Sequence, residues 1–235
     1  MKHDLLSKDT IVALATPHGT GALAIIRVSG AKAIELVERV FFKKDQTPYS
    51  LGDKQSHTIH YGYLMAGNVI VDEVLVSLFK APHSYTGENS VEISCHGSLF
   101  IQQQIIQLLT KQGARPANPG EFTLRAFLNR KLDLSQSEAV NDLIFSNSSV
   151  SHQVAMQQMR GGFSNKIKLL RSKLIDFASL IELELDFSEE DVEFADRTAL
   201  KNLIGSIQNI LDKLVESFEL GNVIKHGIPV AIVGK

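Results

Sequence analysis

The spacing of hydrophobic residues divides the chain into two parts. Up to about residue 130, short apolar segments rich in β-branched residues alternate with turn residues such as Pro17, Gly19 and Gly21, which is typical of strands. Strands are expected at residues 10–16, 22–28, 69–79 and 90–94. Because they follow one another closely in the sequence, the pattern predicts an α+β domain with a mostly antiparallel sheet.

Two helices are expected in addition to these strands. Ser29 is placed to cap the first helix, and the second follows the strand at 90–94. Their apolar faces are expected to comprise Ile34, Val37 and Phe41 in the first, and Ile101, Ile105 and Leu108 in the second. These faces have the spacing of helices that pack on a sheet.

After residue 130, apolar positions recur three and four residues apart, as in long helices. One stripe comprises Phe163, Ile167, Leu170, Leu174, Phe177 and Ile181, and another comprises Leu200, Leu203, Ile207, Leu211, Leu214 and Phe218. An earlier helix is indicated by Ala139, Leu143 and Val154. Ser135 and Glu138 match a capping box, which predicts that this helix begins at about residue 136. The stripes predict an all-α helical bundle, with a free coiled coil as the alternative.

Composition restricts the possible partners and compartments. The chain has 24 Lys and Arg against 26 Asp and Glu, so it lacks the basic surplus that usually accompanies nucleic-acid binding. Its single cysteine, Cys95, excludes an internal disulfide and is typical of a reducing cytoplasm. No apolar run approaches the roughly 18–20 residues that a membrane span needs, and the first ten residues lack a signal-peptide core. We therefore expect a cytoplasmic protein that has no membrane partner.

Three charged residues are candidates for a binding site. Arg27 interrupts an apolar strand, so it either faces water at a strand end or pairs with an acid or an anionic ligand. Glu92 lies between apolar neighbours, which suits a strand with one wet face and also suits a carboxylate that accepts hydrogen bonds from a heterocycle. Lys131 lies on the connector between the two parts, where it is either a solvated linker residue or part of a ligand site.

Two other patterns are rejected as sites. Gly19, Gly21 and Ala24 imitate a dinucleotide fingerprint, but a strand follows them in place of the helix that would hold the pyrophosphate. The glycines are better explained as a tight turn that lets the backbone pass close to another segment. His96 lies beside Cys95, but no further residues have metal-ligand spacing. We expect no metal site.

The last nine residues contain an apolar strand at 230–233, followed by Gly234 and Lys235. A phosphate-binding loop of the type G-x-x-x-x-G-K-[ST] begins in the same way, with its first glycine just after a strand. Lys235 would be the second residue of that pattern and not its phosphate-binding lysine. Gly234 is therefore a candidate nucleotide-binding residue only as the start of such a loop.

Several blocks together resemble the tRNA uridine-34 modification GTPase family, usually called MnmE or TrmE. The blocks are residues 9–30, 84–97, 115–144, 185–194 and 227–235. The third, RPANPGEFTLRAFLNRKLDLSQSEAVNDLI, is the most specific. Within the second, Asn89 stands where the family pattern is expected to have an acid.

The resemblance implies three parts. Residues 1–130 would form an aminomethyltransferase-like domain that binds folate and dimerises, and residues 131–226 would form the first part of the helical domain. Residues 227–235 would be the first strand of a truncated G domain. The family's contacts to a 5-formyl-tetrahydrofolate-type one-carbon donor map onto Arg27, Glu92 and Lys131. No catalytic residue is expected in this part of the family's sequence.

The resemblance also implies what a longer parent protein does. Its G domain would hydrolyse GTP with Mg²⁺ and K⁺, and the parent would form a homodimer through the N-terminal domain. With the flavoprotein MnmG (GidA) it would modify C5 of the wobble uridine in tRNA. The alternatives are a stand-alone folate-dependent aminomethyltransferase-like enzyme, which would need no helical part, and a non-catalytic dimerisation or interaction module.

Overall fold

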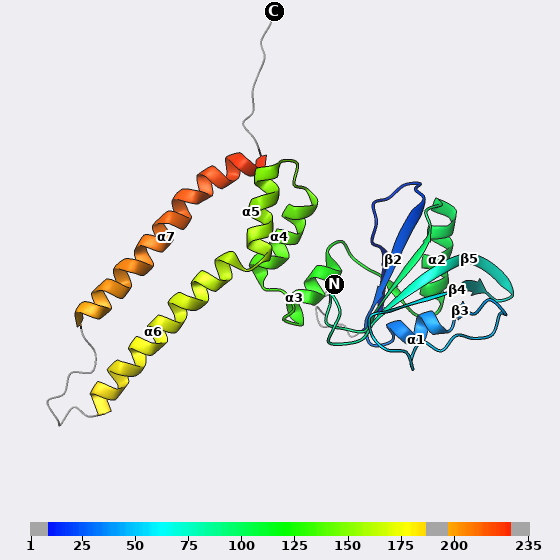
Figure 1. Ribbon diagram of the computed structural model, residues 1–235, viewed down its shortest axis with the longest axis horizontal. Coiled ribbons are helices and arrows are strands. Elements are labelled where there is room, and N and C mark those ends of the chain that lie inside the picture. Colours follow the sequence, from blue (N-terminus) through cyan, green and yellow to red (C-terminus); the bar gives the residue numbers. More distant parts are fainter. Residues whose placement is uncertain (1–8, 187–196, 227–235) are drawn as a thin grey trace, which may run out of the picture. The chain divides into compact units, whose positions relative to one another are not determined.

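The computed structural model describes residues 9–186 and 197–226 of the chain. The chain divides into two compact units, Met1–Leu132 and Asp133–Lys235. Among the described residues, strands occur only in the first unit, and the second is helical (Figure 1). The predicted strand at 230–233 and the candidate Gly234 lie outside the described residues.

Seven strands of the described residues form one sheet, in the order β3-β4-β5-β6-β2-β1-β7. Their bounds are β1 (Ile11–Leu14), β2 (Leu23–Ser29), β3 (Phe41–Phe42), β4 (Thr58–Ala66), β5 (Val69–Phe79), β6 (Ser90–His96) and β7 (Arg115–Pro116). Within these residues, the neighbouring strands are antiparallel except β1 and β7, which are parallel. The predicted strands and the mostly antiparallel arrangement are confirmed, whereas β3, β4 and β7 were not predicted.

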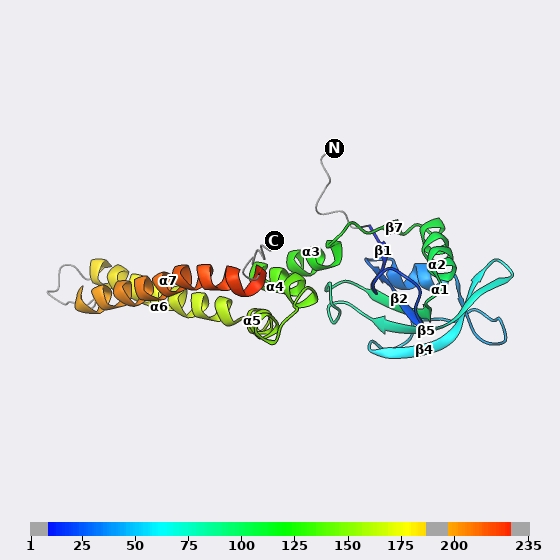
Figure 2. The same ribbon diagram turned by 90° about the horizontal axis from the view of Figure 1, so that it is seen from above.

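Helices α1 (Ala33–Glu38) and α2 (Leu99–Lys111) lie on the same side of the sheet (Figure 2). The core lies between the sheet and these helices. Alternate strand residues such as Ile26, Val76 and Ile93 pack there with Ile105 and Leu109 of α2, and all five are fully buried. Burying one such side chain contributes roughly 1.5–3 kcal/mol. Because strand side chains alternate between faces, the intervening residues project from the face that α1 and α2 leave open.

The first helix differs from its predicted form. It spans six residues, begins after Lys32, and has no side-chain cap. The hydroxyl of Ser29 instead contacts the Thr86 hydroxyl at 2.7 Å and donates to Glu88 Oε2 at 2.8 Å. Phe41 lies in β3 and not on the helix. Ser29 is therefore the last residue of β2, and its side chain binds the segment before β6.

A further helix of the first unit, α3 (Glu121–Leu128), was not predicted. It begins after Gly120, which adopts a left-handed conformation with φ of 74°. Eight residues give too few turns for an apolar period to stand out. Its buried side chains include the charged residues Glu121 and Arg125, so the usual contrast between an apolar and a polar face is also missing.

The described residues of the second unit form helices α4 (Leu134–Ile144), α5 (Ser149–Met159), α6 (Gly162–Asp186) and α7 (Arg197–His226). The capping box differs from the prediction. Asp133 caps α4 by accepting from the Gln136 amide, while the Gln136 side chain accepts from the Asp133 amide. Ser148 caps α5 in the same way, so the predicted single early helix is two helices. Each cap satisfies backbone N–H groups that a helix cannot pair internally.

The two predicted apolar stripes lie on α6 and α7, which run alongside each other in Figures 1 and 2. Leu170 of the first stripe is buried, but Leu174 is 44% exposed and Leu211 of the second stripe is 47% exposed. The described helices thus confirm the all-α character, although Leu174 and Leu211 remain in contact with solvent. None of them is both long enough and apolar enough to cross a membrane.

The glycine turn before β2 passes close to the end of β6, as the sequence predicts for these glycines. Gly21 N donates to Gly97 O at 3.0 Å, and Gly97 N donates to Ala22 O at 3.2 Å. A Cβ at position 97 would lie 2.3 Å from the carbonyl oxygen of Gly21, which is too close for any side chain. Only glycine at position 97 permits this backbone pairing.

We predict that Gly97→Ala destabilises the first unit by about 1–3 kcal/mol, because the added methyl group forces two backbone segments apart. Gly21→Ala is the matched control, since a Cβ there meets only the Leu23 carbonyl oxygen, at 3.6 Å. All four tyrosines lie in the first unit, so urea unfolding followed by tyrosine fluorescence reports on this unit. Equal unfolding free energies for the two variants would contradict the prediction.

Candidate functional site

Arg27 and Glu92 face each other on adjacent strands. They are direct partners in the β2–β6 register, on the sheet face that α1 and α2 do not cover. Arg27 Nη2 lies 2.7 Å from Glu92 Oε1, and Arg27 Nε donates to the same oxygen at 2.9 Å. About a quarter of each side chain remains exposed. Of the alternatives that the sequence left open for Arg27, the structure shows pairing with an acid.

Two aromatic rings flank the guanidinium group of Arg27. Its Cζ lies 5.1 Å from the ring centroid of Tyr85 and 5.5 Å from that of Phe122. At these distances a cation and a ring attract each other by about 0.5–1 kcal/mol, and by more when water is excluded. Tyr85 comes from the segment between β5 and β6, and Phe122 comes from α3, so Arg27 brings together two segments besides the strands of the ion pair.

Glu92 keeps one oxygen available. Both donors from Arg27 bind Oε1, and in the part of the chain that the structure describes Oε2 accepts no hydrogen bond. An ionised carboxylate oxygen is a strong acceptor, and its bonds to N–H donors are roughly twice as strong as bonds between neutral groups. The pair therefore presents a free acceptor beside a cation and two aromatic rings.

Lys131 lies beside the segment that carries Tyr85. Its Nζ donates to the carbonyl oxygen of Pro82 at 3.2 Å. A Cβ at Gly87 would lie 3.1 Å from Lys131 Cγ, so the lysine stem packs along the same segment. Within the described residues, Lys131 forms no hydrogen bond or ion pair with Arg27 or Glu92. The structure thus joins Arg27 and Glu92 directly and brings Lys131 to the segment that covers them.

A cluster of ionised side chains includes Glu88 of this segment, and sequence reasoning missed it. It comprises Asp9, Glu88, Arg115, Glu121 and Arg125. Arg125 is at its centre and is only 7% exposed; it contacts Asp9 at 2.6 Å, Glu88 at 3.2 Å and Glu121 at 3.1 Å. The one signal in the sequence is the spacing of Glu121 and Arg125, four residues apart, which suits an ion pair on a helix.

The cluster shifts the pKa values of its members. Burial raises the pKa of the Glu121 carboxyl, but hydrogen bonds from Arg115, the Asn118 amide and Arg125 outweigh burial and leave the pKa below its usual value. Burial also works against the charge on Arg125, yet Glu88, Asp9 and Glu121 together raise the pKa of its guanidinium. Both groups are therefore ionised in the folded protein at neutral pH.

Cys95 and His96 follow Glu92 on β6, and both lie close to Asp72. Burial, followed by the charge of Asp72, raises the pKa of the Cys95 thiol to about 11, so the thiol is protonated at neutral pH. His96 Nδ1 lies 2.7 Å from Asp72 Oδ1, and its amide donates to the other oxygen at 2.8 Å. The described residues contain no group of three side chains that would hold a metal ion.

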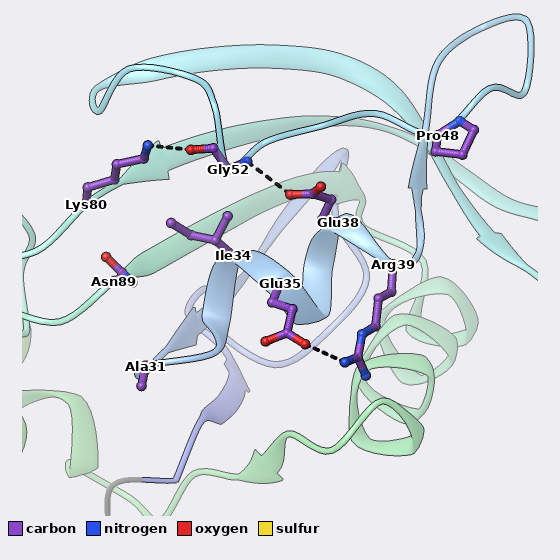
Figure 3. A pocket seen from close by; sticks show the side chains of 9 residues that line it. All are labelled: Ala31, Ile34, Glu35, Glu38, Arg39, Pro48, Gly52, Lys80 and Asn89. Carbon is purple, nitrogen blue, oxygen red and sulfur yellow. Dashed lines mark hydrogen bonds and ion pairs between the residues drawn. The ribbon is translucent and has the colours of Figure 1, made fainter.

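A hollow of about 630 Å³ lies beside α1 (Figure 3). It is lined by Ala31, Ile34, Glu35, Glu38, Arg39, Pro48, Gly52, Lys80 and Asn89. The charged groups in its wall already have partners: Glu35 pairs with Arg39, Glu38 accepts from the Gly52 amide, and Lys80 donates to the Gly52 carbonyl. None of the predicted site residues lines this hollow, and we do not regard it as the candidate site.

We predict that the stability of the first unit falls as the pH drops below about 4.5, the ordinary pKa of a glutamate carboxyl. Because the pKa of Glu121 is lower in the folded protein, the unfolded chain binds the proton first, and acid favours unfolding. In Glu121→Gln this contribution is absent, so the unfolding free energy should depend less steeply on pH between about 3 and 5. Urea unfolding across that range measures both slopes, and identical slopes would contradict the prediction.

Comparisons with known proteins agree with the blocks recognised in the sequence. The family model described as the GTP-binding protein TrmE N-terminus matches residues 10–131, and that of the MnmE helical domain matches residues 134–229.

Among the similar proteins, the tRNA modification GTPase MnmE of Flavobacterium johnsoniae is 60% identical over 231 residues, which are 98% of this chain and 49% of that protein. The proteins of the same name from Christiangramia forsetii and Bacteroides thetaiotaomicron are 62% and 56% identical, over 97% and 98% of this chain and 48% and 49% of their own lengths. The chain thus spans about half the length of these relatives. It belongs to the TrmE (MnmE) family, of which it contains the N-terminal and helical regions.

Proposed function

We propose that the chain is part of a tRNA-modification GTPase whose first unit binds a 5-formyl-tetrahydrofolate-type one-carbon donor and pairs with a second copy of itself. The observation that carries the folate proposal is the Arg27–Glu92 pair, with the rings of Tyr85 and Phe122 near Arg27 and with Glu92 Oε2 accepting no hydrogen bond among the described residues. When bound, the folate would supply the one-carbon unit.

The chemistry of this pair suits a pterin ring. A pterin carries an amino group and a ring N–H side by side, and both are donors that a carboxylate accepts well. Glu92 Oε2 is free to accept from them while Arg27 keeps its bonds to Oε1. Arg27 also places its remaining N–H donors beside the pair, where a ligand carbonyl could accept from them. The rings of Tyr85 and Phe122 provide flat apolar surfaces for stacking.

Lys131 would bind the other end of the ligand. Its ammonium group is exposed and holds only the Pro82 carbonyl, which is a weaker partner than a carboxylate. The glutamate tail of a folate ends in carboxylates, and a lysine beside the pterin-binding segment would attract them. We assign Lys131 to the tail or to a ligand carbonyl, and Arg27 and Glu92 to the pterin.

The sheet face opposite α1 and α2 supports the homodimer. Four apolar residues at alternating positions of β2, β4 and β5 are strongly exposed on it: Leu23 at 70%, Ile59 at 67%, Tyr61 at 48% and Leu75 at 45%. Ile59, Tyr61 and Leu75 are neighbours in the β4–β5 register, whereas His96 and Ser94 of β6 separate them from Leu23. Exposed apolar clusters often mark interaction sites. A second copy of the chain would bury these residues close to Arg27 and Glu92, which lie on the same face.

The remaining parts of the proposal rest on the relatives, which are named tRNA modification GTPases. In the whole protein, a G domain whose phosphate-binding loop starts at Gly234 would hydrolyse GTP with Mg²⁺ and K⁺. With MnmG, it would act on C5 of the wobble uridine of tRNA. The match to the helical domain favours this parent over a stand-alone aminomethyltransferase-like enzyme.

We predict that Glu92→Ala weakens binding of 5-formyl-tetrahydrofolate by about 10- to 100-fold, because a hydrogen bond to a charged group contributes roughly 1.5–3 kcal/mol. Glu73→Ala is the matched control, since Glu73 is an exposed carboxylate on β5 of the same sheet. Isothermal titration calorimetry measures both affinities, and tyrosine fluorescence checks that both variants are folded.

The outcomes separate the alternatives. If Glu92→Ala binds as tightly as Glu73→Ala, Glu92 is not part of the site. If the unaltered chain gives no heat with about 100 μM ligand, the folate proposal fails, and a dimerisation or interaction module becomes the better explanation of the open sheet face.

A further inference from the structure

We propose that Glu88, bound to Arg125, is a positioning residue that fixes the segment 82–89 over Arg27, although it does not touch the ligand itself. In this role it would set the affinity of the site for the pterin. The link to affinity rests on the proposed folate function, whereas the fixing of the segment does not.

The segment 82–89 connects β5 to β6 and supplies much of the candidate site. Its Tyr85 ring lies on the Arg27 guanidinium, and its Pro82 carbonyl accepts from Lys131. The Tyr85 hydroxyl also lies 2.9 Å from that of Thr123, which ties the ring to α3. Because both ends of the site depend on this segment, a shift of about 1 Å would misplace both, and displacements of that size commonly cost large factors in function.

Glu88 anchors the segment by its side chain at two points. Its Oε2 accepts from the Ser29 hydroxyl at 2.8 Å, and both of its oxygens accept from Arg125 Nη1, at 3.3 and 3.2 Å. Ser29 is the last residue of β2, two positions after Arg27, so the first anchor lies on the strand that carries the site. The second anchor is on α3, which also carries Phe122.

Other contacts also hold the segment, but they are weakest at Gly87. The Gly30 amide donates to the Asn89 carbonyl at 3.0 Å, and Thr86 contacts Ser29 and Asn129, at 2.7 Å each. The Gly87 amide, in contrast, reaches the Ser84 carbonyl only at 3.4 Å. The left-handed conformation of Gly87, with φ of 76°, gives the segment a turn that other residues would not stabilise. A side-chain anchor next to this glycine is therefore well placed to restrict its motion.

The charge balance indicates that Glu88 can be removed without unfolding the unit. Its cluster contains the carboxylates Asp9, Glu88 and Glu121 and the guanidinium groups of Arg115 and Arg125. Without Glu88, two carboxylates still face two guanidinium groups, so no buried cation is left unpaired. Removing Arg125 would instead leave three carboxylates near one arginine. Such a variant would report on the stability of the unit and not on the position of the segment.

The same balance supplies a matched control. Asp9→Ala also removes one carboxylate that pairs with Arg125, and it leaves the same ratio of carboxylates to guanidinium groups. The side chains of Asp9 and Glu88 have similar exposure, 32% and 24%. Asp9 precedes β1, and its side chain pairs with Arg115 as well as Arg125, so Asp9→Ala removes a carboxylate from the cluster but keeps the contacts of Glu88 with Ser29 and Arg125.

The experiment compares Glu88→Ala, Asp9→Ala and Glu88→Gln in the full chain. Amide hydrogen exchange without ligand is measured at Gly87 and at Ala81, whose amide donates to Asn89 Oδ1. We expect exchange at these amides to be about tenfold faster in Glu88→Ala and nearly unchanged in Asp9→Ala. The conservative Glu88→Gln, which keeps an acceptor for Ser29, should restore most of the protection.

Calorimetry with 5-formyl-tetrahydrofolate then tests the link to affinity. We expect Glu88→Ala to bind about tenfold more weakly, with Asp9→Ala within a factor of about two of the unaltered chain. If Glu88→Ala and Asp9→Ala had the same exchange rates at Gly87 and Ala81, the positioning role would be overturned. It would also be overturned if the two variants bound the ligand with equal affinity although their exchange rates differed.

If the unaltered chain binds no folate, the proposed function and the effect on affinity both fail. The exchange comparison still decides whether Glu88 fixes the segment. Failure of the folate proposal is thereby distinguished from failure of the positioning role.

Discussion

The candidate site depends on a charge pair on the open face of a sheet. Helices α1 and α2 pack on one face, so the alternate residues of β2 and β6 must project from the other. Arg27 and Glu92 occupy directly opposite positions on these strands, and each neutralises the charge that the other brings to a half-buried surface. An isolated charge there would be costly, whereas the pair is tolerated and leaves an acceptor free.

The segments around this pair are held by a second set of charges. Arg125 lies at the centre of a cluster that joins the start of β1, the segment before β6, β7 and α3. These segments are distant in the sequence, and hydrogen bonds between ionised groups are directional as well as strong. Through Glu88 and Arg125, the cluster links the segment that carries Tyr85 to α3, which carries Phe122, and both rings lie near the Arg27 guanidinium.

Much of the fold follows from local patterns, because alternation and helical spacing are properties of neighbouring residues. They predicted β5, α2 and the stripes of α6 and α7, and the alternation around Glu92 indicated which way its side chain would point. The patterns failed where a side chain binds a distant segment. Ser29 resembles a helix cap but binds Thr86 and Glu88, and Asp133 caps α4 ahead of the predicted Ser135. Tyr85 and Phe122 gave no signal, because their meeting at Arg27 depends on the path of the backbone.

The account can be tested most directly at the Arg27 side chain. In a nitrogen-15 NMR spectrum, the Arg27 Nε–H group reports on its hydrogen bond to Glu92 and on any ligand that binds beside it. Addition of 5-formyl-tetrahydrofolate should shift the Arg27 Nε–H resonance in a saturable way, at concentrations that match the calorimetric affinity. An unmoved resonance, with ligand binding detected by calorimetry, would show that the folate binds elsewhere and would contradict the central claim.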